Sequence, residues 1–200
     1  MKWRDCLPAD AGSEELFRQF KEKAEELTVK VLRAFSPDEA VALLVNEIKV
    51  SRDSVPGVKP PVVSSALTLI DPQQLEKSCR TAAVELSREL DRDVIEKAEV
   101  GISEFDLSIA ASGTIVQDAS GLHARLVSML PPVHIALAGT ASLVGTFPEA
   151  LDVIENVYGE EMPPYLSFIS GPSKTADIER VLTIGVHGPK KLIVIFIDEN

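Results

Sequence analysis

Ten residues near the C-terminus carry the residue types best suited to holding an anion. Residues 170–179 read Ser-Gly-Pro-Ser-Lys-Thr-Ala-Asp-Ile-Glu and follow an apolar segment at 165–169. Gly171 allows a close backbone approach, and Pro172 stiffens the turn. Lys174 adds a cation beside the amides at the start of a helix, where anions are favoured. The segment therefore describes a candidate site for a carboxylate or a phosphate.

The same residues also fit an ordinary turn into a helix. Ser173 or Thr175 can cap that helix with a side-chain oxygen. Asp177 either complements the helix dipole or orients Lys174 or a ligand hydroxyl. The residues alone leave these two interpretations about equal.

A second candidate segment is Gly185-Val186-His187-Gly188-Pro189. Two glycines around His187 predict a tight turn with an exposed imidazole. A helix end followed by a turn into a strand explains the pattern as well. Only a short helix separates this segment, with His187 and Gly188, from residues 170–179. We therefore expect the two segments about two helical turns apart, roughly 10–15 Å, or closer if the turn folds back.

A third candidate, Ser112-Gly113-Thr114, lies between two apolar segments. Gly113 predicts either a bend in a strand or a loop whose amides contact a ligand. Arg125 is a fourth candidate, either as a two-pronged clamp for a carboxylate or phosphate or as a solvated helix cation. His134 stands in the middle of an apolar segment, which is more typical of a structural histidine.

Four segments begin with the pattern that starts an amphipathic helix. Each has a side chain that can cap the first amides, followed by apolar residues at helical spacing. The caps are Ser13, Ser36, Asp71 and Thr146. We expect the first helix over about 13–27, packed on or beside a single domain of residues 1–200. We also expect a reciprocal capping box between Ser36 and Glu39.

Short apolar segments alternate with these helices, at 29–32, 61–63, 67–70, 107–111, 133–138, 165–169 and 192–197. Several are apolar throughout, which is typical of strands covered on both faces. The alternation predicts an α/β fold with three layers, in which helices cover both faces of a mostly parallel sheet. Ligands of such sheets bind beyond the carboxyl ends of the strands, so we expect the anion site there.

Composition excludes several classes of function. The net charge of −11 argues against nucleic acid and anionic membranes, although a basic partner stays open. The cysteines, Cys6 and Cys79, are too few and too far apart to hold an iron–sulfur cluster or a zinc ion in the usual way. The helical pattern places Cys79 in the core. The N-terminus lacks the apolar core of a signal peptide, so we expect a cytoplasmic location.

Read together, five segments resemble the lactate utilization protein C family, the LUD-domain proteins. The order and spacing of these segments match over about the last half of the chain. They are Gly101-Ile102, Ala110–Thr114, Leu130–His134, Gly171–Glu179 and Gly185–Pro189. The last two are the specific part of the resemblance.

The resemblance implies a fold similar to sugar-phosphate isomerases, CoA transferases and formyltetrahydrofolate cyclo-ligase. It also implies a role beside two iron–sulfur partner proteins in oxidising L-lactate to pyruvate, with the clusters held by the partners and none by this chain. Two alternatives stay open. One is a separate enzyme or binding protein for a phosphorylated, CoA-linked or folate-like metabolite, and the other is a non-catalytic assembly module.

The chain departs from the family pattern at two places. Lys174 stands where the family often has arginine, so the charge is kept but the planar two-pronged donor is lost. Ala111-Ser112 stands where the family often has Glu-Thr. Acid–base chemistry at position 111 is therefore excluded in this chain.

Overall fold

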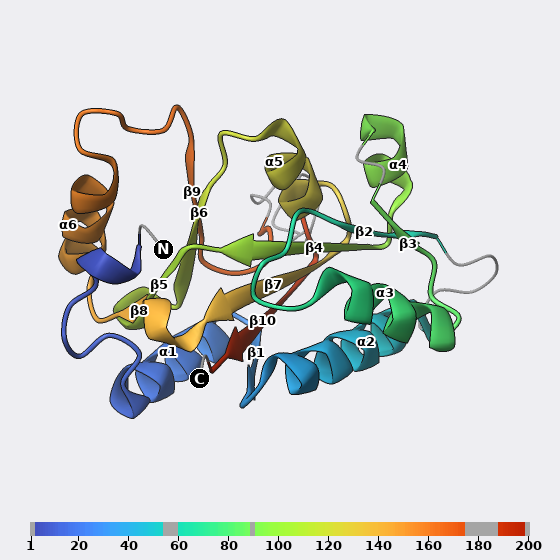
Figure 1. The fold of residues 1–200 in the computed structure, drawn as a ribbon, viewed down its shortest axis with the longest axis horizontal. Coiled ribbons are helices and arrows are strands. Elements are labelled where there is room, and N and C mark those ends of the chain that lie inside the picture. The colour runs from blue at the N-terminus through green and yellow to red at the C-terminus, as the bar shows by residue number, and fades with distance from the viewer. Residues whose placement is uncertain (1–2, 54–59, 89–90, 175–187, 199–200) are drawn as a thin grey trace, which may run out of the picture.

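The computed structural model describes residues 3–53, 60–88, 91–174 and 188–198 (Figure 1). Within these residues the strands form two sheets, one of six strands and one of four. The helices lie on both faces of the larger sheet, and one helix lies beside the smaller one (Figure 1). No helix in the described ranges is long and apolar enough to cross a membrane.

The larger sheet is parallel throughout its described pairings, which confirms the α/β class and the mostly parallel sheet. Its strands, in spatial order, are β1 (Lys30–Ala34), β10 (Lys191–Ile197), β7 (Val133–Gly139), β4 (Val100–Phe105), β2 (Val62–Ser64) and β3 (Leu86–Ser87). All seven residues of β7 are buried, because the strand lies inside the sheet and both faces are covered.

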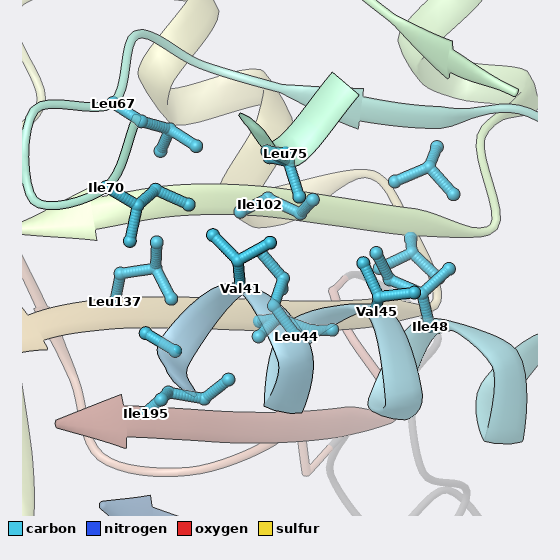
Figure 2. Packing of buried hydrophobic residues seen from close by; sticks show 14 of the residues in the cluster. Val41, Leu44, Val45, Ile48, Leu67, Ile70, Leu75, Ile102, Leu137 and Ile195 are labelled. Carbon is cyan, nitrogen blue, oxygen red and sulfur yellow. The ribbon is translucent and has the colours of Figure 1, made fainter. Parts of the chain in front are cut away.

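Helices α2 (Pro37–Asp53) and α3 (Pro72–Thr81) cover one face of this sheet. Figure 2 shows Leu44 and Ile48 of α2 directed toward the sheet, where Ile102 of β4 lies. All three side chains are fully buried, and burial of one such side chain contributes about 2 kcal/mol. Helices α1 (Glu14–Glu26), α4 (Arg92–Lys97) and α5 (Leu122–Met129) cover the other face.

The smaller sheet was not expected from the sequence. It contains β8 (Leu143–Val144), β5 (Leu107–Ile109), β6 (Thr114–Asp118) and β9 (Leu166–Ile169), in that order. The pairings of β6 with β5 and with β9 are antiparallel. Helix α6 (Phe147–Tyr158) packs against this sheet through Ala150, Val153 and Ile154. Three short 3-10 helices, η1 (Arg4–Cys6), η2 (Ala110–Ser112) and η3 (Thr140–Ser142), complete the described elements.

The predicted helix starts agree with the structure. Ser13 accepts a hydrogen bond from the Leu16 amide, and Asp71 accepts one from the Gln73 amide. Thr146 forms a reciprocal capping box with Glu149. Ser36 caps α2 through the Glu39 amide, but the Glu39 carboxylate accepts from the Phe35 amide rather than from Ser36. The capping box expected between Ser36 and Glu39 therefore closes on the amide of Phe35, one residue before the cap.

Two expected elements were wrong. After Asp71 the apolar residues at helical spacing run from Leu75 to Leu90, a pattern that predicts a longer helix. Helix α3 ends at Thr81 instead, because Ala83 takes a left-handed backbone with a φ of 55°. The chain then turns back into β3. Residues 67–70 form no strand, and residues 68–70 form bends instead. The Glu104 carboxylate holds this loop by accepting hydrogen bonds from Thr68 and Leu69. Cys79 lies in the core as expected, and burial raises the pKa of its thiol to about 11.

Candidate functional site

Three hydroxyl groups from separate parts of the sequence meet beside α1. The Thr114 Oγ1 atom at the start of β6 lies 2.7 Å from the Ser112 Oγ atom of η2. On its other side it lies 2.8 Å from the Ser170 Oγ atom, directly after β9. The antiparallel pairing of β6 with β9 places these residues together. We call Ser112, Thr114 and Ser170 the hydroxyl chain.

Two glycines let this region pack closely on α1 and its end. Gly113 has a φ of 60°, and a Cβ atom there would lie 2.7 Å from the backbone nitrogen of Ala24. Gly171 has a φ of 115°, and a Cβ atom there would lie 3.3 Å from the Leu27 carbonyl oxygen. Gly113 is buried and ends η2, in the connection between β5 and β6, so it forms a turn between two strands rather than a bend within one. A ligand-binding role for Gly113 stays a prediction.

The segments around Ser173 and Gly188 lie side by side. The Ser173 amide donates to the Pro189 carbonyl oxygen over 2.8 Å. A Cβ atom on Gly188 would lie 3.0 Å from the Ser173 Cβ atom. The expected proximity of the two motifs is therefore present where they are described. The Ser173 amide, however, does not point outward toward a ligand, because the Pro189 carbonyl already accepts its hydrogen.

Pro172 is half-buried and the Lys174 side chain is exposed, next to this paired backbone. We use the name loop cluster for residues 112–114, 170–174 and 188–190. Its groups suited to an anion are the ammonium groups of Lys174 and Lys190, both exposed, and the serine and threonine hydroxyls. Thr175, Asp177 and His187 lie outside the described residues, as does the predicted helix that contains Asp177.

The loop cluster does not lie where the sequence placed it. Its Gly171 packs against Leu27, which precedes β1, and Gly188 precedes β10. The Lys190 amide donates to the carbonyl of Pro132, which precedes β7. These are the amino ends of the parallel strands, so the expectation of a site at the carboxyl ends was wrong for this motif. The reason is that β9 belongs to the smaller sheet.

Arg125 and His134 have defined partners elsewhere. The Arg125 guanidinium lies over the Tyr165 ring, with its carbon 4.1 Å from the ring centre. The clamp predicted for Arg125 stays a prediction. His134 is fully buried on β7, and its Nε2 atom lies 2.8 Å from the Ser103 Oγ atom. Burial lowers the pKa of His134 to about 3, so the imidazole is neutral and structural, as its position in the sequence indicated.

A crevice at the carboxyl ends of the large sheet was missed by the sequence analysis. It has a volume of about 670 Å³ and lies where β4 and β7 end and the loop after β2 begins to turn. Trp3 and Leu7 line one part of it, and Thr68 and Leu69 line another. The sequence signal was present, because Glu104 and Asp106 flank the end of a buried apolar segment.

The two carboxylates of this crevice have different surroundings. Glu104 accepts hydrogen bonds from the amides of Thr68 and Leu69 and from the Thr68 hydroxyl. Asp106 accepts one from the Asp118 amide at 2.8 Å. Burial raises the pKa of Asp106 to about 6. The hydrogen bond from Asp118 acts against this shift, whereas the carboxylates of Asp118 and Glu104 add to it.

Metal binding has no support in the described part of the chain. There, no group of three or more His, Cys, Asp or Glu side chains is placed to hold a metal ion. Asp106 and Glu104 are therefore read as hydrogen-bonding groups.

The parallel sheet, its flanking helices and the added smaller sheet define an α/β domain with polar loops at both sheet edges. The family model of the LUD domain matches residues 17–197, and the chain belongs to this family. A solved structure of a DUF162 family protein from Deinococcus radiodurans has the same fold, with a TM-score of 0.66 and 22% identity. The match covers 92% of this chain and 96% of that one.

Curated relatives are similar over a shorter region. The chain is 39% identical over 115 residues to lactate utilization protein C 1 of Bacillus mycoides. It is 42% identical over 106 residues to lactate utilization protein C of Shouchella clausii, and 40% identical over 107 residues to that of Bacillus subtilis. These matches cover 56%, 52% and 52% of this chain, and 49%, 46% and 45% of the relatives. The chain thus matches about half the length of these relatives.

Proposed function

We propose that this protein takes part in lactate utilization, as a component without clusters that works beside iron–sulfur proteins in oxidising L-lactate to pyruvate. The observation that carries the proposal is the LUD-domain match over 17–197, together with relatives near 40% identity that are named lactate utilization protein C. The iron–sulfur partners, the reaction and the cytoplasmic location belong to this proposal.

In this proposal the loop cluster binds a small carboxylate or phosphate. Its support is that Ser173 and Gly188, from two separate motifs, lie in contact, and that the next residue, Lys174, is exposed. Because the Ser173 amide is already bonded to Pro189, recognition would rest on hydroxyls and on Lys174. A lysine attracts an anion as a point charge, without the fixed two-pronged geometry of arginine.

Growth on lactate tests the pathway role. We expect deletion of the gene in its native host to slow growth on L-lactate, and the intact gene to restore it. A Lys174→Ala gene should fail to restore growth, whereas Lys49→Ala, at an exposed lysine on α2, should succeed. Normal growth of the deletion strain on L-lactate would contradict the proposal.

Gentle purification of the tagged protein from lactate-grown cells tests the partner role. We expect proteins that contain iron and acid-labile sulfide to co-purify with it and to be missing when a tag alone is purified. Recovery of the protein without any cluster-bearing partner, at lactate concentrations that support growth, would count against a shared complex.

Binding measurements separate this role from that of a separate metabolite enzyme. L-lactate, inorganic phosphate and CoA are each added while thermal unfolding is followed. A ligand at a hundredfold excess over its dissociation constant stabilises a protein by about 2.7 kcal/mol. Stabilisation by L-lactate or phosphate that is lost in Lys174→Ala supports the loop cluster, and stabilisation by CoA alone supports the alternative.

A further inference from the structure

The carboxyl-edge crevice lies where successive connections leave the large sheet in opposite directions. After β2 the chain runs through residues 67–70 to α3, on the face covered by α2. After β4 it runs into β5 and the smaller sheet, on the other face. Neighbouring strands whose connections diverge in this way leave a crevice at their carboxyl ends, and open parallel sheets bind ligands there.

The crevice has the form of a small-molecule site. Its volume of about 670 Å³ lies within the usual range of such sites, roughly 300–1,000 Å³. Apolar surface comes from Trp3, Leu7 and Leu69, and polar groups come from Asp106 and Ser142. The Trp3 ring is held from behind by an edge-to-face contact with Tyr158, with 5.5 Å between ring centres. Trp3 therefore gives the crevice an aromatic wall, and Tyr158 packs against its ring.

The charged residues that line the crevice favour a positively charged ligand that donates hydrogen bonds, rather than an anion. Glu104 and Asp106 contribute two carboxylates, and Arg4 contributes one guanidinium. Three donors from residues 68 and 69 already satisfy Glu104, so its role is to hold the loop. Asp106 also lines the crevice, and the recorded hydrogen bond to its carboxylate, from the Asp118 amide, reaches the Oδ2 atom. Asp106 is the polar group best placed to meet a ligand.

We propose that this crevice is a second ligand site, separate from the loop cluster, which binds a small organic amine through Asp106 while Trp3 and Leu69 cover the ligand's apolar body. An ammonium supplies both the positive charge and the hydrogen-bond donors that a carboxylate accepts. The proposed amine site requires no lactate and no partner protein, so it can be tested independently of the proposed role in lactate utilization.

The chain offers a direct readout, because Trp3 is its only tryptophan. The probes are 2-phenylethylamine, 2-phenylethanol and 3-phenylpropionate, which share an aromatic body and differ in the charge of the end group. We expect the amine to change the Trp3 fluorescence of untagged protein saturably. The alcohol and the carboxylate should bind at least about tenfold more weakly, because they cannot form a charge-assisted bond to Asp106.

Two variants locate the interaction. Asp106→Asn keeps an acceptor for the Asp118 amide but removes the charge, so amine affinity should fall at least about tenfold. Asp152→Asn, at an exposed position on α6, should bind the amine like the unchanged protein. Equal amine affinity in Asp106→Asn and Asp152→Asn, or equal affinity for the amine and the carboxylate, would overturn the proposal.

A pH titration of the unchanged protein gives a test that does not depend on a variant's folding. The titratable groups that act electrostatically with Asp106 are Glu104, Asp118 and Tyr158, and Arg4 lines the same crevice. Since the pKa of Asp106 is raised to about 6, amine affinity should weaken as the pH falls from about 7.5 to about 5. Amine affinity that is unchanged over this interval, or no saturable fluorescence change at any pH, would overturn the proposal.

Discussion

The two edges of the large sheet hold their polar groups in opposite ways. At the amino edge, the loop cluster presents hydroxyls and the Lys174 ammonium on backbone that two glycines allow to pack against α1 and its end. At the carboxyl edge, the crevice presents carboxylates, and backbone amides hold them in place. In the two proposals made above, the first edge binds an anion and the second binds a cation. The same sheet positions both sites, and the residues of the loops at each edge determine which ligand charge is favoured.

The comparison makes Gly113 the residue with the largest expected effect. In Gly113→Ala the new Cβ atom would lie 2.7 Å from the Ala24 nitrogen, at a φ of 60°. Neither the helix backbone nor the left-handed turn can shift without a large cost in free energy. We therefore expect a loss of at least about 3 kcal/mol in the free energy of unfolding.

Urea denaturation measures this loss. The matched control is Gly121→Ala, where no atom lies within 4 Å of the new Cβ atom. Because Gly121 is the N-cap of α5, where alanine is less favourable than glycine, we expect that control to lose no more than about 1 kcal/mol. Similar stability of the two variants would show that the loop cluster is not fixed on α1.

At the other edge, Glu104→Ala should cost about 2–3 kcal/mol, because it leaves the amides of Thr68 and Leu69 without their acceptor. Glu104→Gln retains one acceptor oxygen and should lose less. Urea denaturation gives the two free energies, and amide hydrogen exchange at residues 68 and 69 shows whether the loop opens. If Glu104→Ala is as stable as Glu104→Gln, these hydrogen bonds do not hold the crevice.

Asp106 should make stability fall as the pH rises. Its folded pKa of about 6 lies above the ordinary 3.8, so between these values the folded state binds more protons than the unfolded state. The full shift corresponds to about 3 kcal/mol, and since part of the carboxyl faces solvent we expect about 2 kcal/mol. Asp106→Asn should therefore gain stability relative to the unchanged protein between about pH 4 and 7.

His134, in the sheet interior, should have the opposite effect on the pH dependence of stability, so that stability rises with pH. Its folded pKa of about 3 lies below the ordinary 6.5, so the unfolded state binds more protons in this interval. Stability is lost as the pH falls below the ordinary value. Urea midpoints for the unchanged protein, Asp106→Asn and His134→Gln between about pH 4 and 7 separate the two contributions. Parallel pH curves for all three proteins would contradict both assignments.

The smallest expected effect on stability is at Lys174. Its side chain is exposed, so Lys174→Ala should change the free energy of unfolding by less than about 0.5 kcal/mol. Phosphate or L-lactate binding, followed by calorimetry, should be lost in the same variant and retained in Lys49→Ala. A large loss of stability in Lys174→Ala would give this residue a structural role instead.

The local elements of the fold could be predicted because their causes are local. Ser13, Asp71 and Thr146 cap helices where the sequence placed them, since a cap depends on residues within one turn. The buried strand β7 and the core thiol of Cys79 follow from apolar patterning. The early end of α3 could not be predicted, because its apolar pattern continues past the turn at Ala83.

The residue types of the loop cluster could be predicted but its position could not, and the residues of the crevice were not identified from the sequence. The sequence identified Gly171, Ser173, Lys174 and Gly188 as one group, and the described members of both motifs do lie together. It placed them at the carboxyl edge because it assigned β9 to the parallel sheet. Strand assignment depends on long-range pairing, which no short segment of sequence encodes by itself.

By itself the sequence determined the helix caps, the buried strands, the α/β class and the pairing of two glycine motifs. These features follow from hydrogen bonds and apolar spacing among near neighbours. Only the tertiary structure decided that β6 and β9 belong to a separate sheet, that the loop cluster lies at the amino edge, and that Trp3 and Asp106 line one crevice. Such contacts join residues far apart in the chain, and the packing of whole elements sets them.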